Sequence, residues 1–238
     1  RVGQHRLSRE LVATLITNSL INRVGITFVS EIAEKSGAAT ADIARAYLIA
    51  RDVYALRPIW SDIEALDGRV QASVQVMLHR DVQTLISRAT LWFLLHGGDL
   101  LDIAGTIASF GTAVAGLGRG IAAVLPEDAD GRILHRAGRY EADGVPQELA
   151  RRIAYLVVMP SACDIVRLAA AQGVPAADVA RLYFAIGESF SFGWLRYQAE
   201  KQQGEQYWQR LAVSALIEEF YAYQRDVTAR VLATGVNE

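Results

Sequence analysis

Cysteine and lysine are scarce in this sequence. Its 238 residues include a single cysteine, Cys163, and two lysines, Lys35 and Lys201, beside 22 arginines. One cysteine cannot form a disulfide within the chain or a cluster of thiolate zinc ligands, and it is typical of a reducing compartment. Cys163 has apolar neighbours in the sequence, so we expect an inert, buried thiol. Both lysines have polar neighbours, which does not favour the desolvated amine that a nucleophilic lysine needs.

An excess of charge of one sign and a long hydrophobic run are also missing. The formal net charge is −2, and 52% of the residues are hydrophobic. This balance lacks the basic excess with which proteins bind nucleic acids or anionic membranes, and it excludes a disordered chain. The most apolar stretch, 103–118, has 16 residues with four glycines, whereas a membrane-spanning helix needs about 20 apolar residues. We therefore expect a soluble domain without a nucleic-acid or membrane partner.

The motifs of catalysis and cofactor binding are absent as well. Residues 111–118 have the glycine spacing of a P-loop, but Leu-Gly replaces the Lys-Ser/Thr that binds phosphate. Residues 116–121 lack the third glycine of a dinucleotide-binding turn and a strand before it. The four histidines have neither a carboxylate three residues earlier nor a histidine four residues away. The sequence therefore predicts no catalytic, no cofactor-binding and no metal-ligating residue.

Helical periodicity, in contrast, runs through almost the whole chain. Apolar residues recur at steps of three and four, strict alternation is rare, and the five prolines lie where one pattern ends and another begins. We expect an all-α multi-helix bundle. The predicted helices span 7–23, 26–36, 40–56, 58–67, 70–95, 99–124, 129–142, 146–171 with a break at Pro160, 175–201 with a break near Gly193, and 205–233.

One segment of the chain is repeated. Residues 37–47 match residues 173–183 at an offset of 136, with glycine, aspartate, arginine and tyrosine in the same places. The aspartate suits the first turn of a helix and can pair with the arginine three residues later, while the tyrosine points toward the core. We expect two related helical units, 1–96 and 148–238, that flank a central helical segment, 97–147. Chance similarity between two alanine-rich stretches is the alternative.

A small polar cluster lies on an otherwise apolar helix near the start of the chain. Asn18 and Asn22 are one turn apart and Arg23 follows them. Because buried amides must be hydrogen-bonded, the pair can mark a contact between helices or domains. Alternatively, Asn22 and Arg23 only end the helix, with Gly25 in a left-handed conformation. The first interpretation makes Asn18, Asn22 and Arg23 candidates for an interdomain contact.

The same cluster belongs to a segment with a family resemblance. Residues 9–28, RELVATLITNSLINRVGITF, resemble the opening of the C-terminal region of large bacterial NAD-specific glutamate dehydrogenases. The stretches ADIARAYLIAR at 41–51, RATLW at 88–92, LDIA at 101–104 and VARLYFAIG at 179–187 resemble that family in the same order. The resemblance spans nearly the whole chain.

This resemblance implies a parent enzyme that interconverts L-glutamate with 2-oxoglutarate and ammonia, using NAD. It also implies a very long cytoplasmic chain that forms a homo-oligomer. Because the first residue is Arg1 rather than Met, we expect a piece of a longer chain; the family's catalytic and Rossmann segments are not in it.

We therefore expect a non-catalytic accessory domain for assembly, stability or regulation. The partners that the resemblance implies are the catalytic and N-terminal regions of the same chain. The alternative is an independent helical module that binds an effector and has no catalytic activity.

Overall fold

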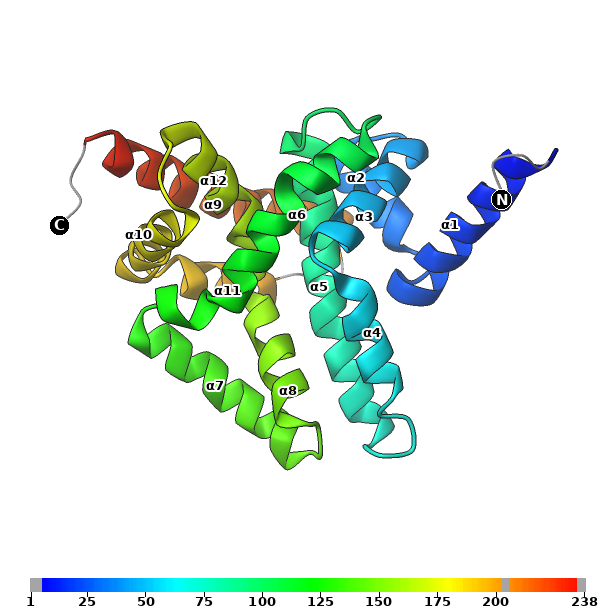
Figure 1. Ribbon diagram of the computed structural model, residues 1–238, viewed down its shortest axis with the longest axis horizontal. Helices are drawn as coiled ribbons and strands as arrows, with labels where there is room; N and C mark the ends of the chain where they lie inside the picture. Colours follow the sequence, from blue (N-terminus) through cyan, green and yellow to red (C-terminus); the bar gives the residue numbers. More distant parts are fainter. Residues whose placement is uncertain (1–5, 203–205, 235–238) are drawn as a thin grey trace.

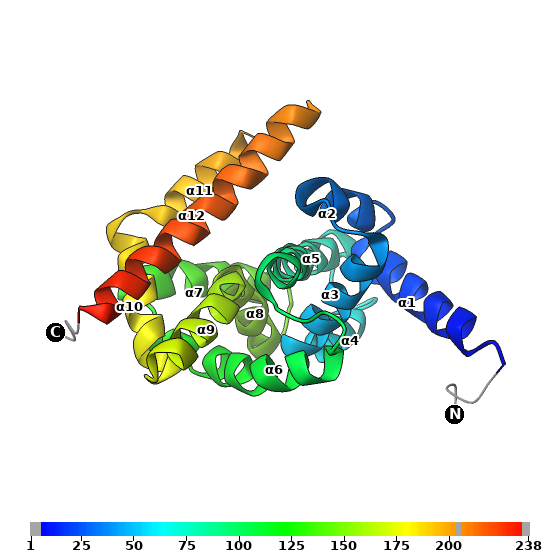
Figure 2. The same cartoon turned by 90° about the horizontal axis from the view of Figure 1, so that it is seen from above.

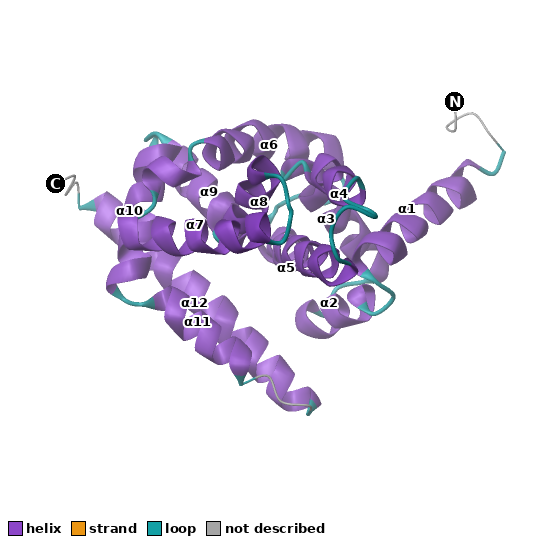
Figure 3. Cartoon of the chain, turned by 90° about the horizontal axis from the view of Figure 1, so that it is seen from below, coloured by secondary structure: helices purple, strands orange, loops and turns teal. Residues whose placement is uncertain are grey.

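Helices make up almost the entire structure. The computed structural model describes residues 6–202 and 206–234, and these residues contain twelve α-helices and no strand, which confirms the all-α prediction (Figures 1 and 3). The helices are α1 (Ser8–Val24), α2 (Phe28–Ser36), α3 (Thr40–Val53), α4 (Leu56–Glu64), α5 (Ala72–His96), α6 (Ile103–Arg119), α7 (Glu127–Ala142), α8 (Gln147–Ala154), α9 (Ala162–Gln172), α10 (Ala176–Ser189), α11 (Phe192–Lys201) and α12 (Tyr207–Ala233). Three short 3-10 helices are η2 (Ile121–Val124), η3 (Tyr155–Val157) and η4 (Met159–Ser161).

Several predicted helix boundaries differ from the observed ones. The helix predicted over 99–124 begins only at Ile103 and ends at Arg119, and η2 follows it. The helix predicted over 146–171 is interrupted around Pro160 as expected, but over a longer stretch: α8 ends at Ala154, η3 and η4 follow, and α9 begins at Ala162. The break expected near Gly193 lies earlier, where Ser191 has a φ of +53°.

Beside a small cluster around Ile133 and Ala137 of α7, one large hydrophobic core extends from Leu20 in α1 to Phe184 in α10. The long helix α5 lies in its middle and packs against α2, α3, α4 and α8. Burial of one large apolar side chain stabilises a fold by about 2 kcal/mol, and α5 buries several at steps of three and four residues. The hydrophobic residues of α5 that are at most 1% exposed are Leu78, Val82, Leu85, Ile86, Ala89 and Phe93.

The repeated segment forms the pairs that its sequence predicted. Tyr47 in α3 and Tyr183 in α10 are both fully buried. Asp42 forms an ion pair with Arg45 in the first turns of α3. The equivalent ion pair in α10 joins Asp178 to Arg181. These contacts confirm the local predictions for both segments.

Two parts of the structure extend away from this core. Helix α1 points outward at one end of the molecule, and the antiparallel pair of α11 and α12 extends from the other side (Figure 2). Helix α1 packs mainly against α2, whereas α12 packs against α9, α10 and α11 and reaches α2. Surface not covered within the chain is therefore concentrated on α1 and on the α11–α12 pair.

Candidate functional site

Helix α1 exposes most of its apolar side chains to solvent. Only Leu20 and Val24 of this helix are buried. Contiguous apolar surface of this kind is typical of a site where another protein surface binds. The large apolar side chains exposed on and beside the helix are Leu7, Leu11, Val12, Leu15, Ile21 and Ile26. These residues, together with Asn18 and Asn22, form what we call the α1 surface.

Two of the three residues predicted for an interdomain contact lie on this surface. Asn18 and Asn22 are both exposed. Arg23 instead contacts α4: it forms an ion pair with Glu64 at the surface, and its guanidinium carbon lies 5.3 Å from the centre of the Trp60 ring. The asparagines are therefore available to another surface, while Arg23 attaches α1 to α4.

Helix α1 ends at Val24 without the left-handed cap that the alternative interpretation required. Gly25 has a positive φ of 89°, but its ψ of 168° lies outside the left-handed helical region. Its N–H donates a hydrogen bond to the carbonyl of Ile21. A glycine is still favoured here, because other residues rarely adopt a positive φ.

The inner side of α1 is attached to the core by a polar contact. The Ser19 and Tyr47 hydroxyl oxygens are 3.1 Å apart, within hydrogen-bond distance. Burial raises the pKa of Tyr47, so its hydroxyl keeps its proton. Together with Arg23, this contact fixes which side of α1 faces outward.

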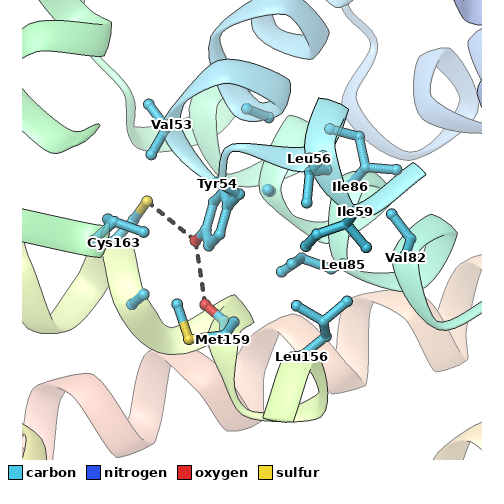
Figure 4. Packing of buried hydrophobic residues seen from close by; sticks show 14 of the residues in the cluster. Val53, Tyr54, Leu56, Ile59, Val82, Leu85, Ile86, Leu156, Met159 and Cys163 are labelled. Carbon is cyan, nitrogen blue, oxygen red and sulfur yellow. Dashed lines mark hydrogen bonds between the residues drawn. The ribbon is translucent and has the colours of Figure 1, made fainter. Parts of the chain in front are cut away.

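The lone cysteine has the environment of an inert thiol. Cys163 is fully buried, and its Sγ lies 3.3 Å from the hydroxyl oxygen of Tyr54, which in turn lies 3.2 Å from the carbonyl oxygen of Met159 (Figure 4). Burial raises the pKa of Cys163 to about 12. The thiol is therefore protonated at neutral pH, in agreement with the prediction from its neighbours.

The described residues provide neither a cluster suited to a metal ion nor a single helix suited to a membrane. Within residues 6–202 and 206–234, no group of three or more His, Cys, Asp or Glu side chains could hold a metal ion. No single helix in the described part of the chain is long and apolar enough to cross a bilayer. Two helix pairs reach that length and composition together, α1 with α2 and the 147–157 segment with 159–172, but they are bent by 92° and 57°.

A buried charge network, which the sequence analysis missed, joins α5, α9 and α12. The carboxylate of Asp164 is 2% exposed and accepts hydrogen bonds from Trp92 Nε1 at 2.9 Å and from Arg167 Nη2 at 3.2 Å. Arg225 of α12 lies 3.6 Å from the same carboxylate. A buried carboxylate needs such partners, because an unpaired one is very costly to desolvate. The one sign of this network in the local sequence was the three-residue spacing of Asp164 and Arg167, which allows an ion pair on one helix face.

Arg88 extends this network toward the α11–α12 pair. Its Nη2 lies 2.5 Å from Glu200 Oε1, its Nη1 lies 3.9 Å from Glu218 Oε1, and its guanidinium carbon lies 5.3 Å from the centre of the Tyr221 ring. Burial raises the pKa of Glu218 despite the nearby arginine. Charged side chains thus connect the first part of the chain to the last.

A cavity of about 190 Å³ lies within this network, between α5, α9 and α12. We call it the α5–α9–α12 cavity. Arg88, Asp164 and Arg225 contribute to its wall. A second hollow of about 340 Å³ shares Arg88 and Glu218 with it and continues toward α2. Both hollows lie between α12 and helices of the body of the domain.

Comparison with known proteins gives one consistent relationship. Residues 1–238 match a family model described as glutamate dehydrogenase, C-terminal. The chain is 36% identical over 229 residues to the NAD-specific glutamate dehydrogenase of Pseudomonas aeruginosa, and 31% identical over 229 residues to that of Halomonas elongata; each match covers 96% of this chain and 14% of the relative. It is 29% identical over 234 residues to that of Mycobacterium tuberculosis, covering 98% of this chain and 14% of the relative.

The chain therefore spans about one seventh of the length of these curated relatives. The match over all 238 residues confirms the family that the sequence motifs predicted. This chain belongs to the family of C-terminal domains of large NAD-specific glutamate dehydrogenases.

Proposed function

We propose that this chain is a non-catalytic accessory domain that supports the assembly and stability of an NAD-specific glutamate dehydrogenase. Its parent enzyme converts L-glutamate to 2-oxoglutarate and ammonia with NAD, in the cytoplasm and as a homo-oligomer. The domain docks onto the catalytic and N-terminal regions of the same chain. Asn18 and Asn22 lie in this interdomain contact, and Arg23 holds the helix that carries them.

The exposure of the α1 surface carries this proposal. Leu15 and Ile21 are 61% and 46% exposed, although an apolar helix face gains about 25 cal/mol for each Å² that it buries. In the relatives, the chain outside the matched region is about six times as long as the matched region itself. The matched family is that of the C-terminal domain. The remainder of the parent chain is therefore the partner that we assign to α1.

The chemistry of the described residues supports a role outside catalysis. Oxidative deamination needs a bound dinucleotide, a site for the substrate carboxylates and a base with a suitable pKa. Here the Cys163 thiol is buried and protonated. Lys201 lies at the end of α11, with its Nζ 4.4 Å from the centre of the Tyr197 ring. We assign no residue of this chain to the reaction.

We also infer that two related units, 1–96 and 148–238, flank the central segment 97–147. Helices α3 and α10 both have 14 residues, and the offset that relates their starts also relates Ala55 to Ser191. These two residues precede α4 and α11, and both have a positive φ, of 48° and 53°. Two such unusual backbone positions at one offset favour duplication over chance similarity.

Substitutions on the α1 surface test the docking proposal in the full-length enzyme. We expect Leu15→Glu and Ile21→Glu to lower the melting temperature of the enzyme and to shift its sedimentation toward smaller species. The matched control is Leu101→Glu, because Leu101 is 75% exposed but lies outside α1. Normal assembly and melting of both α1 variants would contradict the proposal.

An effector-binding module is the second candidate function. The α5–α9–α12 cavity favours it, because this cavity lies between the two inferred units and carries charges of both signs. Binding of a ligand there is compatible with the accessory role.

A further inference from the structure

We propose that the α5–α9–α12 cavity binds a small zwitterion, a molecule that carries one carboxylate and one protonated amine. The inference rests on the lining of the cavity and on hydrogen-bond donors and acceptors that the network leaves available. It deepens the proposed accessory function, because it gives the domain a ligand of its own.

The size of the cavity limits the ligand to a small molecule. Its volume of about 190 Å³ is below the roughly 300 Å³ at which pockets for drug-sized ligands begin. Trp92, Leu95 and Tyr221 provide apolar wall, and charged groups lie among them. A compact ligand with one short apolar part fits this combination.

Arg225 and Arg88 provide the place for a carboxylate. Arg225 has five N–H donors, but its acidic neighbours Asp164 and Asp226 lie at 3.6 and 3.4 Å, and the described residues give it ion pairs without a hydrogen bond. Arg88 uses Nη2 for Glu200, whereas its Nη1 is 3.9 Å from Glu218. Both guanidinium groups therefore retain donors for a ligand carboxylate, which arginine binds strongly.

Glu218 provides the place for an amine. Its carboxylate lines the cavity, and Arg88, the one basic partner that the structure gives it within ion-pair distance, is 3.9 Å away. Asp164 is paired with both Arg167 and Arg225, so Glu218, whose charge is less balanced, is the acceptor that we assign to the amine. A ligand with only negative charge would meet the repulsion of these two carboxylates, and this is why the ligand must also carry a cation.

The remaining titratable groups on the cavity wall fit this assignment. Burial lowers the pKa of His96, which is therefore neutral at pH 7 and adds no charge. Glu219, an exposed residue, lies next to Glu218 on the cavity wall and adds a second acceptor for the amine. The charged groups of the cavity wall are thus two arginines and three carboxylates.

A bound zwitterion would connect parts of the domain that are distant in sequence. Arg88 belongs to α5, whereas Arg225 and Glu218 belong to α12. A ligand that contacts all three would hold the α11–α12 pair against the body of the domain. Its binding would therefore raise the stability of the folded chain.

Thermal unfolding of the 238-residue chain, which has a continuous core of its own, tests the proposal. The probes are the proteinogenic L-amino acids, each at millimolar concentration, with acetate and methylamine as single-charge controls. We expect at least one amino acid to raise the melting temperature, and neither control to do so. Isothermal titration calorimetry with that amino acid then gives the dissociation constant.

Two kinds of variant locate the binding site. Arg225→Gln removes the carboxylate partner, and Ala222→Phe fills the cavity without removing a charge. We expect each to weaken binding by about tenfold or more, and the second remains informative if the first unfolds the chain. The matched controls are Arg230→Gln and Ala215→Phe, two exposed positions of α12 outside the cavity wall.

Three results would overturn the proposal. They are the absence of a stabilising amino acid, equal stabilisation by acetate alone, and unchanged affinity in both cavity variants. Because binding is measured on this chain by itself, these results do not depend on docking through α1. Failure of the ligand proposal and failure of the accessory role are therefore distinguishable.

Discussion

The indole Nε1 of Trp92 donates a hydrogen bond of 2.9 Å to the carboxylate of Asp164, 72 residues away in the sequence. This bond links α5 to α9 inside the domain, where both residues are buried. It also places the carboxylate next to Arg225 of α12. The contact thus holds together the three helices that surround the cavity.

Removal of this bond is expected to destabilise the domain. Trp92→Phe keeps an aromatic ring but removes one of the two hydrogen-bond donors of the buried carboxylate, which costs about 1–3 kcal/mol. Denaturant unfolding of the chain measures this loss. The control is Trp208→Phe, because Trp208 is 74% exposed. Equal stability of the Trp92 variant and the wild type would show that the bond contributes nothing.

The contact between Ser19 and Tyr47 is expected to hold α1 in place. Tyr47→Phe removes the hydroxyl group 3.1 Å from Ser19, and the net loss is about 1 kcal/mol. Hydrogen exchange should become faster in α1 and remain slow in α5. Tyr223→Phe serves as control, because that tyrosine is exposed on α12. Unchanged exchange in α1 would assign its position to other contacts.

Cys163 is expected to be unreactive in the folded chain. Because burial raises its pKa to about 12, iodoacetamide should modify it slowly at pH 8 and rapidly after unfolding. The raised pKa also means that the folded state retains a proton that the unfolded thiol loses. The contribution of this group to stability is therefore complete below the ordinary thiol pKa of 9.0 and falls as the pH rises toward 12.

The control for this pH dependence is Cys163→Ala. Because this variant has no thiol, it should lose less stability than the wild type as the pH rises above 9.0. Rapid modification of the native thiol at pH 8 would contradict the assignment of a protonated, inaccessible sulfur.

The parts of the fold that depend on local sequence were predictable. Apolar spacing located α5, and the repeated segment predicted both the buried tyrosines and the Asp42–Arg45 ion pair. The end of α8 was not predictable, because two 3-10 helices, one before Pro160 and one that contains it, replace the α-helix there. The spacing of apolar residues in the sequence does not distinguish such 3-10 turns from a continuous α-helix.

The candidate sites also differ in whether the local sequence reveals them. Asn18 and Asn22 stood out because polar residues on an apolar helix are conspicuous in a sequence. The Asp164 network did not, because Trp92, Asp164 and Arg225 come from three distant helices and only the fold brings them together. The outward direction of α1 also depends on its contacts with Tyr47 and Glu64.

The most direct test of the accessory role uses the parent enzyme truncated before the region that matches this chain. Its sedimentation is measured alone, with the wild-type 238-residue chain added, and with the Leu15→Glu chain added. We predict that the truncated enzyme fails to assemble, that the wild-type chain restores assembly, and that the Leu15→Glu chain does not. Normal assembly of the truncated enzyme without any added chain would contradict the account.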